Sequence, residues 1–254
     1  MSSSQQGRLD RETRLASASS TICLIIPCYN EARRLDLGKF RGCSPGMSFV
    51  FVDDGSTDGT ADMIRRQGAT AHLVLLPTNQ GKAEAVRQGM LYAKREGLLT
   101  STDWVGYWDA DLATPLDEVN GMLAYAATFR EPVDAILGSR VYKLGSNIDR
   151  SFARHIAGRV FTTIAATLLK LGCYDSQCGA KLFRPALIDE AFGNAFVSRW
   201  IFDIEILLRL RQRHPVEYPL RHWADVAGGK TRVVPLVIPT LIDLFRIWRR
   251  YRPS

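Results

Sequence analysis

Residues 104–111 read Trp-Val-Gly-Tyr-Trp-Asp-Ala-Asp, an apolar stretch followed directly by two aspartates one residue apart. The apolar part, Trp104 to Trp108, has the length of a short β-strand, so we expect the strand to open into a loop at Asp109 and Asp111. Carboxylate oxygens are the ligands that Mg²⁺ and Mn²⁺ prefer, and these ions are commonly shared with substrate phosphates. The stretch therefore indicates a metal-held diphosphate, although a solvated loop or a helix cap has the same sequence signature.

Further apolar runs of strand length lie on both sides of this stretch, and helical patterns separate them. The runs cover residues 21–27, 48–52, 71–76 and 135–137. The helical patterns cover 60–67, 81–95 and 115–129, and the last opens with a proline, as helices often do. Strands that alternate with helices predict an α/β fold with a mostly parallel sheet flanked by helices. Ligands of such sheets bind beyond the carboxyl ends of the strands, where the two aspartates lie.

The composition is that of an ordinary globular protein with one large domain. The chain has 254 residues, which is enough to bury a sizeable core. Its five cysteines are an odd number without a Cys-x-x-Cys pair, which argues against a disulfide framework and a zinc site. No run of about 18 apolar residues predicts a transmembrane helix. Residues 1–20 are Ser-rich and lack the apolar core of a secretory signal, so we expect a disordered tail there.

The net charge of +7 is concentrated in two late segments. Residues 139–184 carry eight Lys or Arg against two Asp, and residues 240–254 carry four Arg against one Asp. Such an excess favours an anionic partner, for which a nucleic acid, an anionic membrane surface and a phosphorylated acceptor are candidates. A solvated charged face explains the same counts.

Polar loops follow the first three predicted strands, and they cover residues 27–31, 53–60 and 79–82. The first two lack the Gly-rich patterns of a P-loop or a dinucleotide-binding turn, so ATPase and dinucleotide functions lose their usual support. Asp54 can accept a hydrogen bond from a base N–H or a ribose hydroxyl. Lys82 can neutralise a phosphate near a helix N-terminus, but a lone lysine in a loop is commonly just solvated.

Taken in order, these motifs resemble those of family 2 glycosyltransferases, which have the GT-A fold, a Rossmann-like α/β fold. The motifs are Pro27-x-Tyr29-Asn30-Glu31, Asp53-Asp54-Gly55-Ser56-x-Asp58-Gly59-Thr60, Asn79-x-Gly81-Lys82 and Asp109-Ala110-Asp111-Leu112. Three later motifs resemble the polyprenyl-phosphate branch of that family, which includes dolichyl-phosphate β-glucosyltransferases and dolichol-phosphate mannose synthases. They are Gly138-Ser139-Arg140, the run from Asp175 to Phe183, and Trp200-x-Phe202-Asp203-x-Glu205. The resemblance covers residues 21 to 232.

The resemblance implies a metal-dependent, inverting glycosyltransferase with Mg²⁺ or Mn²⁺ as its cofactor. It would move a hexose from a nucleotide-sugar donor to a polyprenyl phosphate acceptor and give a β-linked product. The dolichyl-phosphate β-glucosyltransferases within the branch favour UDP-glucose as the donor. A GDP-mannose donor, a soluble hydroxyl acceptor and a non-catalytic protein that binds nucleotide sugars stay open as alternatives. A nucleic acid is not expected as a partner.

The same resemblance implies roles for individual residues. The implied nucleotide-binding residues are Pro27, Tyr29, Glu31, Asp54, Lys82, Asp109 and Ala110, and the implied metal ligands are Asp109 and Asp111. The acceptor phosphate would contact Arg140, Arg150 and Arg154. The sugar would contact Gln177, Lys181, Asp203 and Glu205.

Asp203, Arg140 and Asp111 are the implied catalytic residues. An acceptor phosphate is already ionised near neutral pH, so Asp203 would act as a base only if one is needed. Alternatively, Asp203 and Glu205 only hydrogen-bond to sugar hydroxyls or to Arg209. Mannose synthases of this group can carry a polar metal-site residue where this chain has Ala113, so we expect a water or weaker metal binding there.

The chain ends in an amphipathic helical pattern over residues 235–251, with four arginines nearby and Trp248 within it. This pattern predicts a helix at an anionic membrane surface, and hence a peripheral membrane protein on the cytoplasmic side. Docking of the helix on its own domain, or on a second subunit of a homodimer, is the alternative. A second helical pattern, over 152–171, would lie against the bilayer or face the core. The predicted organisation is a tail at 1–20, a catalytic domain at 21–232 and the C-terminal helix at 233–254.

Overall fold

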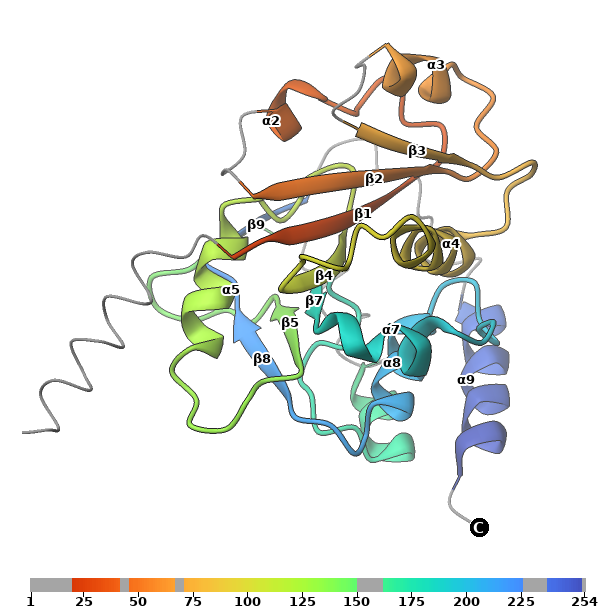
Figure 1. Cartoon of the computed structure of the whole chain (residues 1–254). Helices are drawn as coiled ribbons and strands as arrows, with labels where there is room; N and C mark the ends of the chain where they lie inside the picture. Colours follow the sequence, from red (N-terminus) through yellow and green to blue (C-terminus); the bar gives the residue numbers. More distant parts are fainter. Residues whose placement is uncertain (1–19, 42–45, 67–70, 150–161, 226–236, 253–254) are drawn as a thin grey trace, which may run out of the picture.

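The computed structural model of the chain describes residues 20–41, 46–66, 71–149, 162–225 and 237–252. Its centre is a seven-stranded sheet with helices on both faces (Figure 1). The strand order is β3-β2-β1-β4-β7-β5-β8. The strands are β1 (Ile22–Cys28), β2 (Met47–Asp53), β3 (Ala71–Leu75), β4 (Trp104–Trp108), β5 (Ala135–Ser139), β7 (Ala180–Phe183) and β8 (Pro215–Pro219).

The prediction of a mostly parallel sheet is confirmed. Neighbouring strands pair in parallel except around β7, which runs antiparallel to both β4 and β5. The five apolar runs became β1 to β5. Neither β7 nor β8 was predicted from the sequence.

The three predicted helices are present but shorter than their sequence patterns. They are α3 (Thr60–Arg65), α4 (Lys82–Arg95) and α5 (Glu118–Ala126). The chain after Pro115 first makes three i→i+3 hydrogen bonds, to the carbonyls of Pro115, Leu116 and Asp117, and α5 begins only at Glu118. The other helices are α2 (Gly38–Arg41), the 3₁₀ turn η1 (Pro185–Leu187), α7 (Ile188–Phe192), α8 (Phe202–Arg209) and α9 (Val237–Tyr251), and residues 162–169 are also helical.

Side chains of β1 alternate between two apolar cores, one on each face of the sheet. Leu24 and Ile26 pack with α2 and α5, whereas Ile25 packs with α4, α7 and α8. Helix α4 lies so close to the sheet that a Cβ on Gly89 would be 2.2 Å from the Cγ2 atom of Ile25. Coverage of both faces explains why the strand reads as a continuous apolar run.

Parallel pairing brings the carboxyl ends of β2, β1 and β4 to one edge of the sheet. In the register of these strands, Cys28 lies opposite Asp53 and Ile25 lies opposite Tyr107. A small two-stranded sheet of β6 (Asn147–Asp149) and β9 (His222–Ala224) borders the loop after β4. The Ala224 N–H donates to the carbonyl of Ala113 at 3.0 Å. The loops at this edge therefore come from segments far apart in the sequence.

The C-terminal amphipathic pattern forms helix α9, as predicted. Leu244 and Ile247 are buried against side chains of α8 and of the helical residues 162–169. Leu241, Ile242 and Phe245 are 45%, 47% and 57% exposed on α9. One apolar side of the helix thus docks on its own domain, and further apolar side chains face outward. No helix among the described residues is long and apolar enough to cross a membrane.

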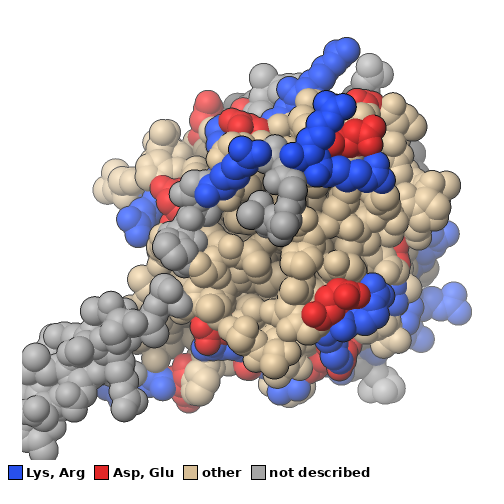
Figure 2. All heavy atoms as spheres, turned by 45° about the horizontal axis from the view of Figure 1, so that its top comes forward, with Lys and Arg blue, Asp and Glu red and all other residues tan. Residues whose placement is uncertain are grey.

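Charged side chains are intermixed on the face drawn in Figure 2, where Lys and Arg lie beside Asp and Glu around a largely uncharged centre. Several sequence predictions fall outside the described residues. These are the tail, apart from Ser20, the start of the 152–171 pattern with Arg150 and Arg154, and the boundary between 232 and 233.

Candidate active site

A pocket of about 580 Å³ lies beyond the carboxyl ends of β1, β2 and β4. Predicted site residues from six segments of the chain line it: Pro27, Tyr29, Glu31, Asp54, Lys82, Asp109, Ala110, Asp111, Gln177 and Asp203. The other lining residues are Cys28, Arg34, Asn79, Gly81, Ala85 and Trp200. The strand-end loops thus meet as the sheet topology requires.

The two aspartates sit in a tight turn directly after β4. The Ala113 N–H donates to Asp111 Oδ1 at 3.1 Å, and Lys82 Nζ donates to Asp109 Oδ1. Burial raises the pKa of Asp111, and the neighbouring charge of Asp109 raises it further. Burial opposes the charge of Lys82, but the carboxylates of Asp109, Asp203 and Asp111 together outweigh it and raise the pKa of that ammonium. The turn therefore concentrates negative charge that attracts cations.

This donor set fits a hard divalent cation. Both ligands are carboxylate oxygens, and a cation would relieve the repulsion that raises the pKa of Asp111. Within the described part of the chain, no group of three or more His, Cys, Asp or Glu side chains forms a metal site. Ala113 has no side-chain ligand to offer. Asp109 and Asp111 would therefore hold Mg²⁺ or Mn²⁺ together with oxygens from a ligand and water.

Gly179 makes room for the Asp109 carboxylate, and the sequence predictions did not include it. A Cβ at position 179 would lie 1.8 Å from Asp109 Oδ2. The Asp109 N–H also donates to the carbonyl of Gly179 at 3.2 Å. The signal in the sequence was the glycine within the Gln177-Cys178-Gly179 motif, because a glycine inside a polar motif often marks a close approach.

Asp54 is buried, and both of its carboxylate oxygens accept backbone hydrogen bonds. The donors are the N–H groups of Gln80, at 2.7 Å, and Gly81, at 2.8 Å. Burial raises the pKa of Asp54, and these two hydrogen bonds oppose the shift. Asp54 thus ties the loop before α4 to the end of β2. Each oxygen has a second lone pair for a ligand in the pocket.

Arg34 is a second residue that the sequence predictions missed. Its Nε and Nη2 atoms donate to the Glu31 carboxylate at 2.9 and 2.6 Å. This contact with Glu31 raises the pKa of Arg34. Its Nη1 atom is buried in the pocket wall without a hydrogen-bond partner among the described residues. A small shift of the Arg34 side chain would be needed to bring this nitrogen to a ligand in the pocket.

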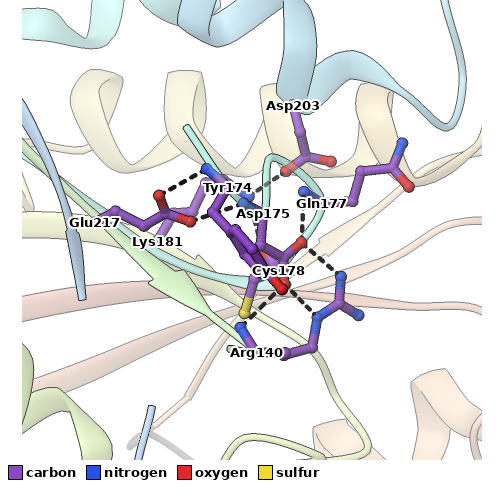
Figure 3. Close-up of polar contacts among 8 residues, drawn as sticks. All are labelled: Arg140, Tyr174, Asp175, Gln177, Cys178, Lys181, Asp203 and Glu217. Atoms are coloured by element: carbon purple, nitrogen blue, oxygen red, sulfur yellow. Dashed lines mark hydrogen bonds and ion pairs between the residues drawn. The ribbon is translucent and has the colours of Figure 1, made fainter. Parts of the chain in front are cut away.

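Asp203 lines the pocket from the first turn of α8, whereas Lys181 lies behind it. Asp203 Oδ1 accepts from Lys181 Nζ at 2.6 Å and from the Tyr107 hydroxyl (Figure 3 shows the lysine contact). Lys181 is fully buried and does not line the pocket. The predicted contact between Lys181 and a sugar stays a prediction, and the structure places the ammonium behind Asp203 rather than in the pocket lining.

Arg140 does not line the pocket and is paired with Asp175. Its Nε and Nη2 atoms donate to the two Asp175 oxygens at 2.7 and 2.8 Å. Burial works to raise the pKa of Asp175, but Arg140 outweighs it and lowers that pKa to about 2. Glu217 accepts the N–H groups of Tyr174 and Asp175, each at 2.7 Å (Figure 3). Arg140 thus holds the loop that contains Gln177 in place. Two of the five N–H donors of its guanidinium form these hydrogen bonds to Asp175.

Glu205 does not line the pocket, so the structure does not bring this predicted sugar contact together with the other site residues. Its Oε1 atom accepts the N–H groups of Val197, at 2.7 Å, and Ser198, at 3.2 Å. Its Oε2 atom is 3.7 Å from Arg209. The carboxylate is fully buried and organises the segment before α8.

Comparisons with known proteins agree with this geometry. The sequence model of a family described as glycosyl transferase family 2 matches residues 23–192. A dolichyl-phosphate beta-glucosyltransferase of Drosophila melanogaster is 31% identical over 257 residues, which covers 92% of this chain and 76% of that protein. Its counterpart in Dictyostelium discoideum is 29% identical over 250 residues, with 91% and 74% coverage.

Solved structures share the fold at lower sequence identity. Glucosyl-3-phosphoglycerate synthase from Mycobacterium tuberculosis, in complex with Mn²⁺, UDP-glucose and phosphoglyceric acid, has a TM-score of 0.64 and 19% identity. That match covers 94% of this chain and 83% of the other. Mannosyl-3-phosphoglycerate synthase from Rubrobacter xylanophilus has a TM-score of 0.65 and 15% identity, with 95% and 77% coverage.

Proposed function

The chain belongs to glycosyl transferase family 2 and is a glycosyltransferase, and from that premise we propose that it transfers glucose from UDP-glucose to a polyprenyl phosphate. The observation that carries the proposal is the pair Asp109 and Asp111 in one pocket with Asp54, Lys82 and Arg34. Relatives described as dolichyl-phosphate beta-glucosyltransferases support the glucosyl group and the acceptor. A structural neighbour that binds UDP-glucose with Mn²⁺ supports the pairing of metal and donor.

Asp109 and Asp111 would hold the divalent cation, and Asp54 would receive an N–H of the base or a ribose hydroxyl. The bound cation stabilises the negative charge that grows on the departing diphosphate. Lys82 lies beside Asp109 at the start of α4, where its ammonium can shift to a diphosphate oxygen. Arg34 adds a further donor through Nη1. Cationic groups thus surround the position proposed for the leaving group.

In the proposed reaction, an oxygen of the acceptor phosphate attacks C1 of the glucose from the face opposite the diphosphate. The bond between C1 and the diphosphate oxygen breaks, and UDP leaves with the electron pair. The attacking oxygen is already ionised near neutral pH, so no proton has to be removed and Asp203 is not required as a base. Displacement in line inverts the anomeric centre and gives a β-linked glucosyl phosphate.

The acceptor phosphate is proposed to bind on the Arg140 side of the pocket. Arg140 keeps free N–H capacity beyond its two hydrogen bonds to Asp175, and guanidinium forks match phosphate geometry. Arg150 and Arg154 belong to the same proposal on sequence grounds.

Helix α9 is proposed to hold the enzyme at the cytoplasmic surface of a membrane, where a polyprenyl phosphate is available. The outward side chains Leu241, Ile242 and Phe245 would enter the interfacial region. Arg246 and Arg249 of the same helix are exposed and would contact anionic headgroups.

A donor and acceptor panel tests this function. The purified protein is incubated with Mn²⁺ and labelled UDP-glucose or GDP-mannose, each with a short polyprenyl phosphate, the matching polyprenol, or a soluble sugar. We expect label in the lipid product with UDP-glucose and polyprenyl phosphate. Equal transfer to the polyprenol or to the soluble sugar would refute the proposed acceptor, and preference for GDP-mannose would refute the donor.

A further inference from the structure

A buried lysine and a buried tyrosine converge on one oxygen of Asp203. Tyr107 on β4 and Lys181 on β7 are directly opposite each other in the antiparallel register, so their side chains project from the same face of the sheet. Asp203 reaches this position from α8, which packs on that face. Lys181 Nζ and the Tyr107 hydroxyl both donate to Asp203 Oδ1.

The Lys181 ammonium has no exposed surface, and two of its three N–H donors have acceptors among the described residues. Besides Asp203, Nζ donates to the carbonyl of Cys178 at 2.5 Å, and it lies 5.5 Å from the centre of the Tyr107 ring. A buried ion pair adds little net stability, because desolvation offsets the attraction between the charges. The pair is therefore better explained by what it does to the geometry of Asp203.

The second oxygen of Asp203 has a different environment. Oδ2 makes no hydrogen bond to the described part of the chain, and Asp203 lines the pocket. In Figure 3 this oxygen points to the side on which the Gln177 side chain lies. Lys181 and Tyr107 thus fix one oxygen and leave the other directed at whatever occupies the pocket.

We propose that Tyr107 and Lys181 are positioning residues, which hold Asp203 so that its Oδ2 atom accepts a hydrogen bond from a hydroxyl of the donor sugar. This inference rests on the proposed function, because it takes the ligand to be a nucleotide sugar. It assigns the nucleotide and the sugar to different parts of the pocket. Asp54 and Asp109 bind the nucleotide, whereas Asp203, held by Tyr107 and Lys181, binds the sugar.

The test compares the affinities for UDP-glucose and for UDP, measured by calorimetry in the presence of Mn²⁺. Tyr107→Phe keeps the ring and removes a single oxygen. We expect it to weaken UDP-glucose binding about tenfold and to leave UDP binding within about twofold, because one hydrogen bond to a charged group is lost. Lys181→Met should have a larger effect in the same direction. If Lys181→Met does not fold, Tyr107→Phe decides the question.

A double-mutant cycle separates positioning from a general structural effect. In an Asp203→Asn background, Tyr107→Phe should change UDP-glucose affinity no further. Tyr92→Phe is the matched control. The Tyr92 hydroxyl on α4 contacts His72 on β3 and, among the described residues, no residue that lines the pocket. Its UDP-glucose and UDP affinities should equal those of the wild type.

Two results would overturn the inference. One is an equal loss of UDP and UDP-glucose affinity in Tyr107→Phe, and the other is a full Tyr107→Phe effect in the Asp203→Asn background. Failure of the proposed function would look different, since the wild type would then transfer no glucose to polyprenyl phosphate. The binding experiment still tests the inference when only the acceptor is wrong, and a third result, a wild type that binds UDP-glucose no more tightly than the Asp203→Asn variant, would also overturn it.

Discussion

Gly179→Ala should disable the metal site while leaving the fold intact. The new Cβ would stand 1.8 Å from Asp109 Oδ2 and 2.3 Å from its Cγ. To reach the 3.4 Å of ordinary contact, the carboxylate oxygen must move by about 1.6 Å. Metal–ligand distances tolerate only about 0.2 Å, and a misplacement of about 1 Å can reduce a rate about 100-fold. We expect Mn²⁺ affinity to fall at least 100-fold, about 2.7 kcal/mol.

Isothermal titration of Mn²⁺ into the protein, with UDP present, measures this loss directly. Gly172→Ala is the matched control, because a Cβ there meets nothing within 4 Å, and it should bind Mn²⁺ like the wild type. Urea unfolding of both variants checks that the fold persists. Wild-type Mn²⁺ affinity in a folded Gly179→Ala variant would refute the claim that Asp109 binds the cation from the position it occupies in the structure.

Three further predictions concern the pocket and the fold. Arg34→Met should weaken UDP binding about tenfold in calorimetry, because a charge-assisted donor is lost, and unchanged affinity would remove Arg34 from the site. Gly89→Ala should lower the free energy of unfolding in urea by about 1–3 kcal/mol, because its Cβ would be 2.2 Å from Ile25 Cγ2; an unchanged midpoint would contradict the close packing of α4. Arg140 lowers the pKa of Asp175 from 3.8 to about 2, so this pair stabilises the fold above about pH 4 and loses its effect as the pH falls through 2. In urea unfolding at a series of pH values, the stability difference between the wild type and Asp175→Asn should therefore shrink from pH 4 to pH 2, and a constant difference would contradict the assignment.

Among the strands that the sequence predicted, only the edge strand β3 is partly exposed along its whole length, and the others are largely buried on both faces. Such strands must be apolar throughout, so 22–28 and 104–108 are visible as continuous runs. Strand β7 has only four residues, and Lys181 within it hides the apolar pattern. That lysine is tolerated because Asp203, Cys178 and Tyr107 satisfy it, and these contacts depend on tertiary structure that a local pattern does not contain.

The site was predictable where it follows from strand ends, and less so where it depends on side-chain direction. The loops after parallel neighbours meet at one edge, so the predicted lining residues from Pro27 to Asp111 came together. Asp203 and Glu205 are two positions apart on α8, and residues at that spacing do not share a helix face. One therefore reaches the pocket while the other is buried behind it. Arg34 has one guanidinium nitrogen without a partner among the described residues, and Gly179 lacks the Cβ that would collide with Asp109. Both features are visible only from contacts in the folded chain.

Transfer of labelled glucose from UDP-glucose to a short polyprenyl phosphate, with wild type and Asp111→Ala side by side, tests the central claim most directly. We expect the wild type to label the lipid when Mn²⁺ or Mg²⁺ is present, and excess chelator to stop the reaction. We also expect Asp111→Ala, once a urea-unfolding transition has shown that it is folded, to label no lipid. Full transfer by Asp111→Ala, or by the wild type in excess chelator, would contradict a glycosyl transfer that depends on a metal held by these aspartates.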